Sequence, residues 1–142
     1  MRAAAVDLGS VRVGLAVADE LGLMAHPRPA FSGANRPGLL RALARFAVEE
    51  GITLFVVGLP RSLSGREGPP ARRAREFAAE LRTISKAEVI LLDERLTTRQ
   101  AQRQLHERGL DMRKSRDRID SEAAAVLLQG WLDSKRPPDD DA

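Results

Sequence analysis

The sequence lacks cysteine and tyrosine, and its 142 residues include only four phenylalanines and one tryptophan. The absence of cysteine excludes disulfides, thiol catalysis and zinc sites with cysteine ligands. No apolar run approaches the roughly 20 residues that a membrane-spanning helix requires, and the N-terminal segment has no long apolar stretch typical of a signal peptide. We therefore expect one cytoplasmic domain, since this length can bury a core without cross-links.

Histidine is also scarce, with only His26 and His106. Both are isolated in the sequence, so we expect surface positions for them. No serine is paired with a histidine and an acid in a recognisable pattern, which argues against a serine-hydrolase triad. The aromatic residues do not alternate with basic ones, so they are expected in the core rather than in a base-stacking surface.

The charge balance is mildly basic, with 23 Lys and Arg against 20 Asp and Glu and a net charge of +3. Three of the acids are Asp139, Asp140 and Asp141, so the rest of the chain is more basic than the total suggests. Arginine supplies 20 of the 23 basic residues, and its planar guanidinium pairs well with phosphate. This composition is compatible with a nucleic-acid partner without identifying one.

Hydrophobic patterning predicts an α/β domain. Predicted strands cover 2–7, 11–18, 53–58 and 88–92. A weaker strand in 22–34 contains two prolines, so it either lies at a sheet edge or is broken. Predicted helices run from Asn35–Pro37 to Gly51 and over 70–82, 97–109 and 119–132. An antiparallel hairpin followed by strand–helix alternation predicts a mixed five-stranded sheet flanked by helices, spanning residues 1–134. Residues 59–69 and 110–118 are expected to be loops, and 135–142 a disordered acidic tail.

Three acidic residues lie at the ends of two predicted strands. Asp7 ends the first strand, where it either caps the turn at Gly9 or places a carboxylate at a functional edge. Asp93 and Glu94 follow the strand at 88–92, and ligand sites in open α/β sheets favour the carboxyl edge of the strands. Because side chains alternate along a strand, only one of these two acids can face a given side. The alternative for this pair is a salt bridge with Arg95 or Arg99.

Asp120 lies at the start of the last predicted helix. It shares a helical face with four apolar residues, Ala124, Leu127, Leu128 and Trp131. A carboxylate on such a face is costly to bury unless a cation compensates it. The alternative is that Asp120 only interacts favourably with the helix dipole. The spacing alone leaves both interpretations open.

Asp7, Glu94 and Asp120 would converge at one edge if their strands are neighbours in the sheet. They would then provide three carboxylates and no histidine or cysteine ligand, which suits Mg²⁺ or Mn²⁺. Two such ions about 3.5–4 Å apart can activate a water and stabilise the leaving oxygen of a phosphodiester. The three acids are therefore candidate catalytic and metal-binding residues of a nuclease.

Basic residues cluster in two segments of the sequence. Residues 95–118 hold eight of them against three acids: Arg95, Arg99, Arg103, Arg108, Arg113, Lys114, Arg116 and Arg118. A second segment contains Arg61, Arg66, Arg72, Arg73 and Arg75, interrupted by glutamates. Such groups bind phosphates with strong salt dependence and little base specificity, although an ordinary solvated surface has the same composition. The candidate nucleic-acid contacts are Arg12, Arg61, Arg66, Arg95, Arg99, Arg113, Lys114 and Arg116.

Four segments together resemble the RuvX family, also called YqgF, of RNase H-like resolvases. They read DLGSVRVGLAVAD at 7–19, VVGLPRSLSGREGPPA at 56–71, LLDERLTTRQA at 91–101 and IDSEAAAVLLQGWL at 119–132. The resemblance spans nearly the whole domain. It implies an RNase H-like fold with metal-binding acids at Asp7, Glu94 and Asp120, Asp93 being the alternative to Glu94 in the third segment.

Members of this family are described both as Holliday junction resolvases and as nucleases that mature the 5′ end of pre-16S rRNA. The resemblance therefore implies a Mg²⁺- or Mn²⁺-dependent endonuclease acting on structured nucleic acid, in DNA recombination or in ribosome biogenesis. Symmetric cutting of a four-way junction needs two active sites and suggests a homodimer, whereas rRNA processing does not demand one.

Two other interpretations remain at this point. The chain could be a noncatalytic nucleic-acid-binding module in which the acids are structural. The Asp-Leu-Gly segment before a hairpin also resembles the phosphate loop of sugar kinases and actin-like proteins, but those proteins close two such domains around ATP, and 142 residues supply one.

Overall fold

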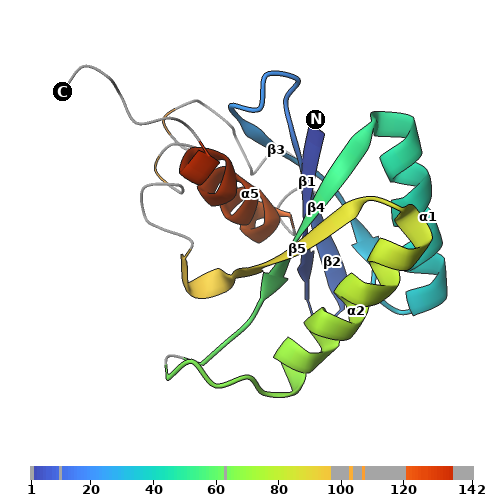
Figure 1. Cartoon of the computed structure of the whole chain (residues 1–142), viewed down its shortest axis with the longest axis vertical. Coiled ribbons are helices and arrows are strands. Elements are labelled where there is room, and N and C mark those ends of the chain that lie inside the picture. The colour runs from blue at the N-terminus through green and yellow to red at the C-terminus, as the bar shows by residue number, and fades with distance from the viewer. Residues whose placement is uncertain are drawn as a thin grey trace.

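The computed structural model describes residues 2–9, 11–62, 64–96, 103, 107 and 121–135. Its centre is a five-stranded sheet with the strand order β3-β2-β1-β4-β5 (Figure 1). The strands are β1 (Arg2–Leu8), β2 (Arg12–Ala18), β3 (Ala25–Ser32), β4 (Ile52–Leu59) and β5 (Glu88–Asp93). The helices are α1 (Arg36–Glu50), α2 (Pro69–Ser85) and α5 (Glu122–Lys135), and a short 3₁₀ helix η1 (Glu94–Leu96) follows β5. The predicted α/β domain with a mixed five-stranded sheet is confirmed.

The first three strands form an antiparallel meander, as predicted. β1 pairs with β2 around a tight turn in which the Gly9 amide donates to the Arg12 carbonyl at 3.0 Å. β3 contains Pro27 and Pro29, which lack backbone N–H groups. The strand lies at the sheet edge, where it pairs on one side only and such residues are tolerated. The ladder between β2 and β3 is irregular between Val13 and Leu15.

β1, β4 and β5 are parallel neighbours, so their carboxyl ends meet at one edge of the sheet. β4 lies between the other two and is buried along nearly its whole length. Its apolar, β-branched sequence is typical of a strand covered on both faces. This register determines which residues can meet at the carboxyl edge.

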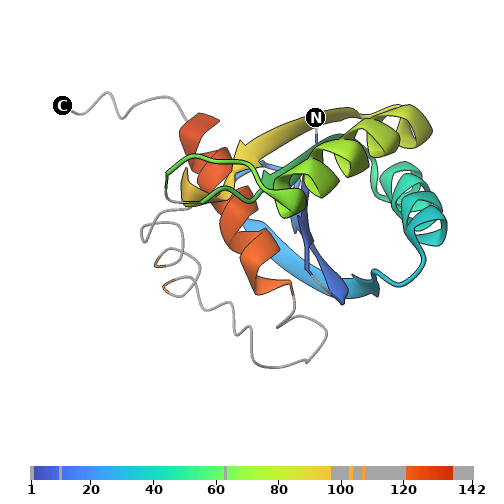
Figure 2. The ribbon, with the colours of Figure 1, turned by 90° about the horizontal axis from the view of Figure 1, so that it is seen from below.

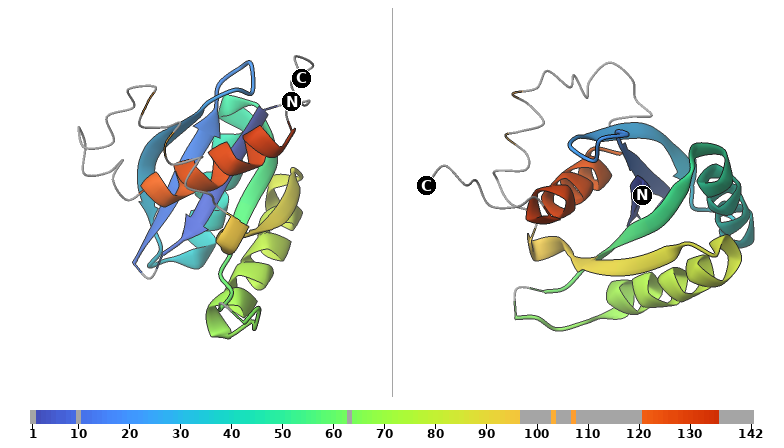
Figure 3. Two further views of the ribbon diagram at one scale, coloured as in Figure 1. Left: turned by 90° about the vertical axis from the view of Figure 1, so that its left-hand side faces the viewer. Right: turned by 45° about the horizontal axis from the view of Figure 1, so that its top comes forward.

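Helices cover both faces of the sheet (Figures 2 and 3). Alternate strand residues such as Val6, Phe55 and Val57 pack with α1 and α2 in one core. The intervening residues, including Ala5 and Val56, pack with α5 in a second core. Each strand therefore sends successive side chains into different cores, as its pleat requires.

The helix boundaries follow the sequence signals closely. Asn35 caps α1 by accepting a hydrogen bond from the Gly38 amide at 3.0 Å, and Gly51 ends the helix in the left-handed conformation with φ of 68°. Helix α2 begins at Pro69, one residue before the predicted start, and extends to Ser85. α5 begins at Glu122 rather than 119, with Ser121 in a turn, and ends at Lys135, which we had assigned to the tail.

Several expectations concern residues outside the described ranges. The loop at 110–118 and the acidic tail after Lys135 belong to this group. Of the predicted helix at 97–109, the structure describes only Arg103 and Glu107, and both are helical. Among the helices that the structure describes, none is long and apolar enough to cross a membrane.

Helix α5 carries two fully buried polar side chains, Ser121 and Gln129. The Gln129 side chain accepts a hydrogen bond from the Ala25 amide at 2.9 Å and donates to the Leu23 carbonyl at 3.0 Å. It therefore binds the helix to the start of β3. Without this side chain, the buried Ala25 amide would lose its acceptor.

Replacing Gln129 with leucine should destabilise the protein by about 1–3 kcal/mol, because the buried Ala25 amide loses its acceptor. Ser134→Ala, at an exposed position of the same helix, should change the free energy of unfolding by less than about 0.5 kcal/mol. Urea unfolding of both variants measures the difference. Equal stability of the two variants would show that Gln129 does not anchor α5.

Candidate active site

Asp7 and Glu94 meet across β4 at the carboxyl edge of the sheet. Side chains on the α5 face of β1 include Ala3 and Ala5, so the same alternation places Asp7 on that face. Val6 pairs with Val57 and Leu92 pairs with Gly58, so Gly58 lies between the end of β1 and the end of β5. The absence of a side chain there leaves the space that Glu94 occupies.

Gly58 makes this meeting possible. A Cβ atom added to it would lie 2.6 Å from the Glu94 Oε1 atom, closer than Cβ atoms approach other heavy atoms in proteins. Any other residue at this position would push the Glu94 carboxyl away. A glycine near the end of a strand rich in β-branched residues often marks such a close approach. We did not assign a role to Gly58 from the sequence, although this signal was present.

The carboxyl groups of Asp7 and Glu94 are hydrogen-bonded to each other. Partial burial of Glu94, this hydrogen bond and the negative charges of Asp7 and Asp93 raise the pKa of Glu94 to about 7. Two carboxyl groups that lie close enough to share a hydrogen bond cannot both ionise easily without a compensating cation. Near neutral pH the Glu94 carboxyl therefore retains a proton in part of the molecules, and a cation could replace that proton.

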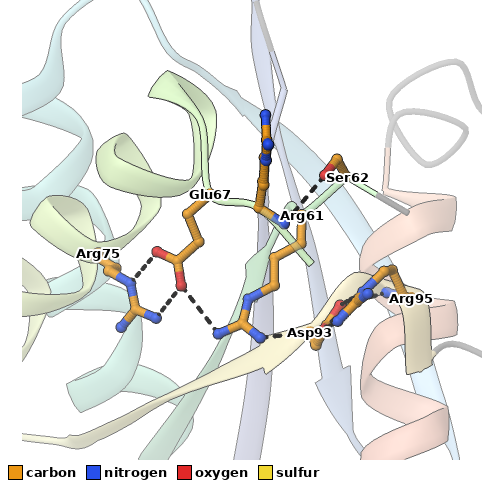
Figure 4. Close-up of polar contacts among 7 residues, drawn as sticks. Arg61, Ser62, Glu67, Arg75, Asp93 and Arg95 are labelled. Atoms are coloured by element: carbon orange, nitrogen blue, oxygen red, sulfur yellow. Dashed lines mark hydrogen bonds and ion pairs between the residues drawn. The ribbon is translucent and has the colours of Figure 1, made fainter. Parts of the chain in front are cut away.

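Asp93 is adjacent to Glu94 in the sequence, but its carboxylate lies in the opposite electrostatic environment. Its carboxylate accepts hydrogen bonds from the Arg95 amide at 2.9 Å and from the Arg95 guanidinium at 2.7 Å. Arg61 lies 3.7 Å away on its other side (Figure 4). The hydrogen bonds from Arg95 hold the pKa of Asp93 down at about 2. The salt bridge that was the alternative interpretation of this pair is thus present for Asp93.

The ion pairs of Asp93 continue into the loop between β4 and α2. Glu67 accepts two hydrogen bonds from Arg75 at 2.6 Å and one from Arg61 at 3.0 Å. Arg61 thereby bridges Glu67 and Asp93, as Figure 4 shows. We call Arg61, Glu67, Arg75, Asp93 and Arg95 the arginine cluster. It connects the loop to the end of β5, next to Glu94.

Asp120, the third predicted acid, lies outside the described residues, and no group of three or more possible metal ligands occurs within them. Two hydrogen bonds hold the side chain of its neighbour, Ser121. The Ser121 hydroxyl accepts a hydrogen bond from the Leu15 amide at 3.0 Å and donates one to the Arg28 carbonyl at 2.6 Å. It thus fills the irregular part of the β2–β3 ladder. Leu15 is adjacent to Gly14, the register partner of Asp7.

The predicted nucleic-acid contacts fall into three groups. Arg12 and Arg66 are exposed, at the start of β2 and in the β4–α2 loop. Arg61 and Arg95 belong to the arginine cluster. The remaining four lie outside the described residues: Arg99, Arg113, Lys114 and Arg116. The described members therefore lie in a loop and at the ends of elements around the carboxyl edge that carries Asp7 and Glu94.

The family model named RuvX and described as Holliday junction resolvase matches residues 1–134. The chain belongs to the RuvX family. A relative from Anaeromyxobacter sp. (strain K), named "Putative pre-16S rRNA nuclease", is 46% identical over 137 residues, which cover 96% of this chain and 100% of the relative. Relatives of the same name from Geobacillus kaustophilus and Halalkalibacterium halodurans are 41% and 37% identical over 138 residues, covering 96% of this chain and 100% and 99% of theirs.

Solved structures of resolvases share the fold of this RuvX-family chain. Thermus thermophilus RuvC in complex with a Holliday junction substrate matches with a TM-score of 0.62 and 13% identity, covering 95% of this chain and 96% of that one. Fowlpox virus resolvase with Holliday junction DNA gives a TM-score of 0.57 and 14% identity, covering 94% and 98%. The fold is RNase H-like, as the sequence motifs implied.

The raised pKa of Glu94 predicts how stability depends on pH in the metal-free protein. The pKa of this carboxyl is near its usual 4.5 in the unfolded chain and about 7 in the folded protein. The folded state therefore binds more protons between these values, and its stability should decrease as the pH rises from about 5 to 7. Glu94→Gln should flatten this part of the profile in thermal unfolding with chelator.

Glu88→Gln is the matched control, because Glu88 is exposed at the opposite end of β5. It should leave the pH profile of the thermal midpoint unchanged. A profile that is the same in wild type and Glu94→Gln would show that Glu94 does not hold the extra proton.

Proposed function

We propose that this protein is a metal-dependent endonuclease that hydrolyses phosphodiester bonds in structured nucleic acid. The observation that carries the proposal is the meeting of Asp7 and Glu94 across Gly58 at the carboxyl edge of an RNase H-like sheet. Carboxylate oxygens are the ligands that Mg²⁺ and Mn²⁺ prefer. Like charges held this close also favour a cation between them. The residues therefore fit the metal that the family resemblance implies.

Asp7 and Glu94 would hold the metal, and Asp120 is proposed as the third ligand. Asp120 directly precedes Ser121 in the sequence, and the two hydrogen bonds of Ser121 fix the start of α5 beside the strand that pairs with β1. A bound divalent ion, or a pair of them, would supply an activated water and stabilise charge on the leaving oxygen.

Asp93 has a positioning role in this proposal. Its carboxylate is engaged by Arg95 and Arg61, so it is not available as a ligand in the way that Glu94 is. These ion pairs hold the end of β5 against the β4–α2 loop. They also determine which of the two adjacent acids turns toward Asp7. We therefore assign the metal to Glu94 rather than to Asp93.

The arginines around the site would bind the phosphate backbone of the substrate. Arg12 and Arg66 are exposed near the carboxyl edge, and Arg61 and Arg95 lie beside Glu94 in the arginine cluster. We propose the same role for Arg99, Arg113, Lys114 and Arg116. Contacts of this kind place the strand without reading its sequence and weaken with increasing salt.

Two substrates suit such a site. The names of the relatives favour the 5′ end of pre-16S rRNA, and the family description favours the four-way DNA junction. Symmetric cleavage of a junction requires two active sites and hence a two-fold dimer. Cleavage of rRNA by one monomer requires only the site described here.

The proposal is tested with labelled four-way junctions, linear duplex and a pre-16S rRNA 5′ fragment, each with Mg²⁺, Mn²⁺ or chelator. Asp7→Asn should lower metal-dependent cleavage of the preferred substrate at least ~100-fold, because it removes a charged ligand. Substrate binding in chelator should persist. Gel assays of cleavage and binding measure both.

Asp19→Asn is the matched control, since Asp19 caps the distant β2–β3 turn by accepting from the Leu23 amide, which asparagine can also do. Its cleavage rate should equal that of wild type. Undiminished cleavage by Asp7→Asn would remove Asp7 from the mechanism. Binding of nucleic acid without cleavage in either metal would instead support a noncatalytic binding module.

Gly58→Ala tests the geometry of the pair without removing either acid. The added methyl group should displace the flexible end of Glu94 from Asp7 and lower cleavage by ~10- to 100-fold. The free energy of unfolding should change by less than about 1 kcal/mol, because glycine inside a strand is itself less favourable than alanine and the Glu94 side chain is flexible.

Gly68→Ala controls for this change, because its added Cβ would meet its nearest neighbour, the Cδ atom of Pro70, at an ordinary distance of 3.7 Å. It should cleave as wild type does. Full activity of Gly58→Ala would show that the close approach of Glu94 to Asp7 is not needed for cleavage.

A further inference from the structure

Two members of the arginine cluster bind the same carboxylate, that of Glu67. Its Oε2 atom accepts hydrogen bonds from Arg75 at 2.6 Å and from Arg61 at 3.0 Å, and its Oε1 atom accepts a second one from Arg75 at 2.6 Å. Figure 4 shows the two guanidinium groups reaching this carboxyl group from different sides. A guanidinium binds phosphate oxygens through the same pair of parallel hydrogen bonds. The arrangement is therefore one that also suits a phosphate group.

The cluster adjoins the Asp7–Glu94 pair at the end of β5. Arg61 also pairs with Asp93 at 3.7 Å. Leu91 packs in the core beneath α1 and α2, so the alternation of side chains places Asp93 on that side of the strand too. Glu94 turns to the opposite side, toward Asp7. A substrate strand with its reacting phosphate at the acidic pair would therefore have the cluster beside a neighbouring phosphate.

The ion pairs of Glu67 are open to solvent. The side chains of Arg75, Arg61 and Glu67 are 47%, 30% and 28% exposed. Pairs of this kind contribute little to stability, because water screens the charges and the long side chains lose freedom. Glu67 nevertheless stays ionised, since the hydrogen bond from Arg75 holds its pKa at about 2. Near neutral pH the arginines are therefore released only when another anion takes the place of this carboxylate.

Helix α2 does not account for the position of this carboxylate. Gly68 is the N-cap of the helix, and the next two residues are prolines, which have no backbone N–H group to offer. Among the described residues, Arg61 and Arg75 supply all of the hydrogen bonds that the Glu67 carboxylate accepts. The arginines alone hold this side chain, and it can leave them without uncapping α2.

We infer that Arg61 and Arg75 form a binding site for one phosphate of the substrate backbone, and that Glu67 occupies this site in the free protein. When nucleic acid binds, its phosphate replaces the Glu67 carboxylate between the two guanidinium groups. A backbone phosphate and a carboxylate each carry one negative charge, so the exchange preserves the charge balance of the cluster. Glu67 thus keeps the arginines oriented and lowers their affinity for other anions. The choice of a nucleic-acid phosphate rests on the proposed nuclease function.

This exchange makes the site selective for an extended backbone. An anion that makes only this contact gains little, because it replaces hydrogen bonds that Glu67 already provides. A nucleic acid that also reaches the exposed Arg12 and Arg66 has further contacts with which to displace the carboxylate. The site therefore favours a chain of phosphates over a single one, without reading base sequence.

Binding of nucleic acid to the full-length protein in chelator tests the exchange. A labelled four-way junction and a labelled pre-16S rRNA 5′ fragment are titrated with protein, and fluorescence anisotropy gives the dissociation constants. Glu67→Gln should bind the preferred one ~3- to 10-fold more tightly, because the phosphate no longer competes with a carboxylate for charge-assisted hydrogen bonds. Arg75→Gln should bind it more weakly by a similar factor. If Glu67 only oriented the arginines, Glu67→Gln would instead weaken binding.

Glu76→Gln and Arg72→Gln are the matched controls, because they make the same changes of charge at exposed positions of α2 outside the cluster. Each should change the dissociation constant less than its counterpart in the cluster. Glu67→Gln is also combined with Arg75→Gln. In that background the loss of the Glu67 charge should tighten binding less than in wild type, since one of the two guanidinium groups that it occupies is gone. Circular dichroism checks the folding of every variant.

Four results would overturn the inference: weaker or unchanged binding by Glu67→Gln, equal effects in the cluster variants and their controls, equal tightening by Glu67→Gln with and without Arg75, or no binding of either nucleic acid. Its failure can be separated from failure of the proposed function, because cleavage is measured with metal. Tighter binding by Glu67→Gln without cleavage by wild type would support the phosphate site and contradict the nuclease. Metal-dependent cleavage with no gain in binding for Glu67→Gln would do the reverse.

Discussion

The close approach of two carboxyl groups is the constraint on which the rest of the site depends. Asp7 and Glu94 come from strands that are not adjacent in the sheet, and β4 separates them. Their mutual repulsion and partial burial are unfavourable, as the raised pKa of Glu94 shows. A protein retains such a pair only where the surrounding structure fixes both partners, and the usual reason is function. The sheet register, Gly58 and the arginine cluster each hold part of this arrangement.

The buried central strand gives the pair its rigidity. β4 is hydrogen-bonded on both sides and packed on both faces, so the ends of β1 and β5 cannot move independently. On the α5 side, Ser121 and Gln129 bind the helix to β2 and β3 through backbone groups. Hydrogen bonds of this kind fix the helix along its axis as well as against the sheet, which apolar packing alone does less well. The start of α5 is consequently held relative to the strand that pairs with β1.

The sequence was sufficient for most of the fold because local signals and packing agree. The hairpin, the proline-containing edge strand, the buried strand before Gly58 and the capped helix after Asn35 were all predicted and confirmed. Patterning could not show the bridging hydrogen bonds of Ser121 or Gln129, because their partners lie about a hundred residues away in the chain.

The sequence singled out the acids of the candidate site but could not show how they are arranged. Strand alternation indicated that only one of Asp93 and Glu94 could face the active edge, and it could not say which. In the structure Asp93 pairs with Arg61 and Arg95, and Arg61 in turn pairs with Glu67, which Arg75 also binds across the loop. Ion pairs between loop residues carry no periodic signal in a sequence. Asp120 was singled out by its place at the start of an apolar helix, and its part in the site stays a prediction.

Asp93 and Glu94 are adjacent at the end of β5, and their pKa values are shifted in opposite directions. The pKa of Asp93 is held at about 2 by guanidinium groups, so it stays charged and keeps its ion pairs at any pH near neutrality. The pKa of Glu94 is raised to about 7, so its charge responds to what occupies the site. Environments that shift the pKa values of neighbouring titratable groups in opposite directions are typical of active sites in which the two groups have different roles. Asp93 thus keeps its ion pairs with the arginines, and Glu94 carries the carboxyl group whose charge can change near neutral pH.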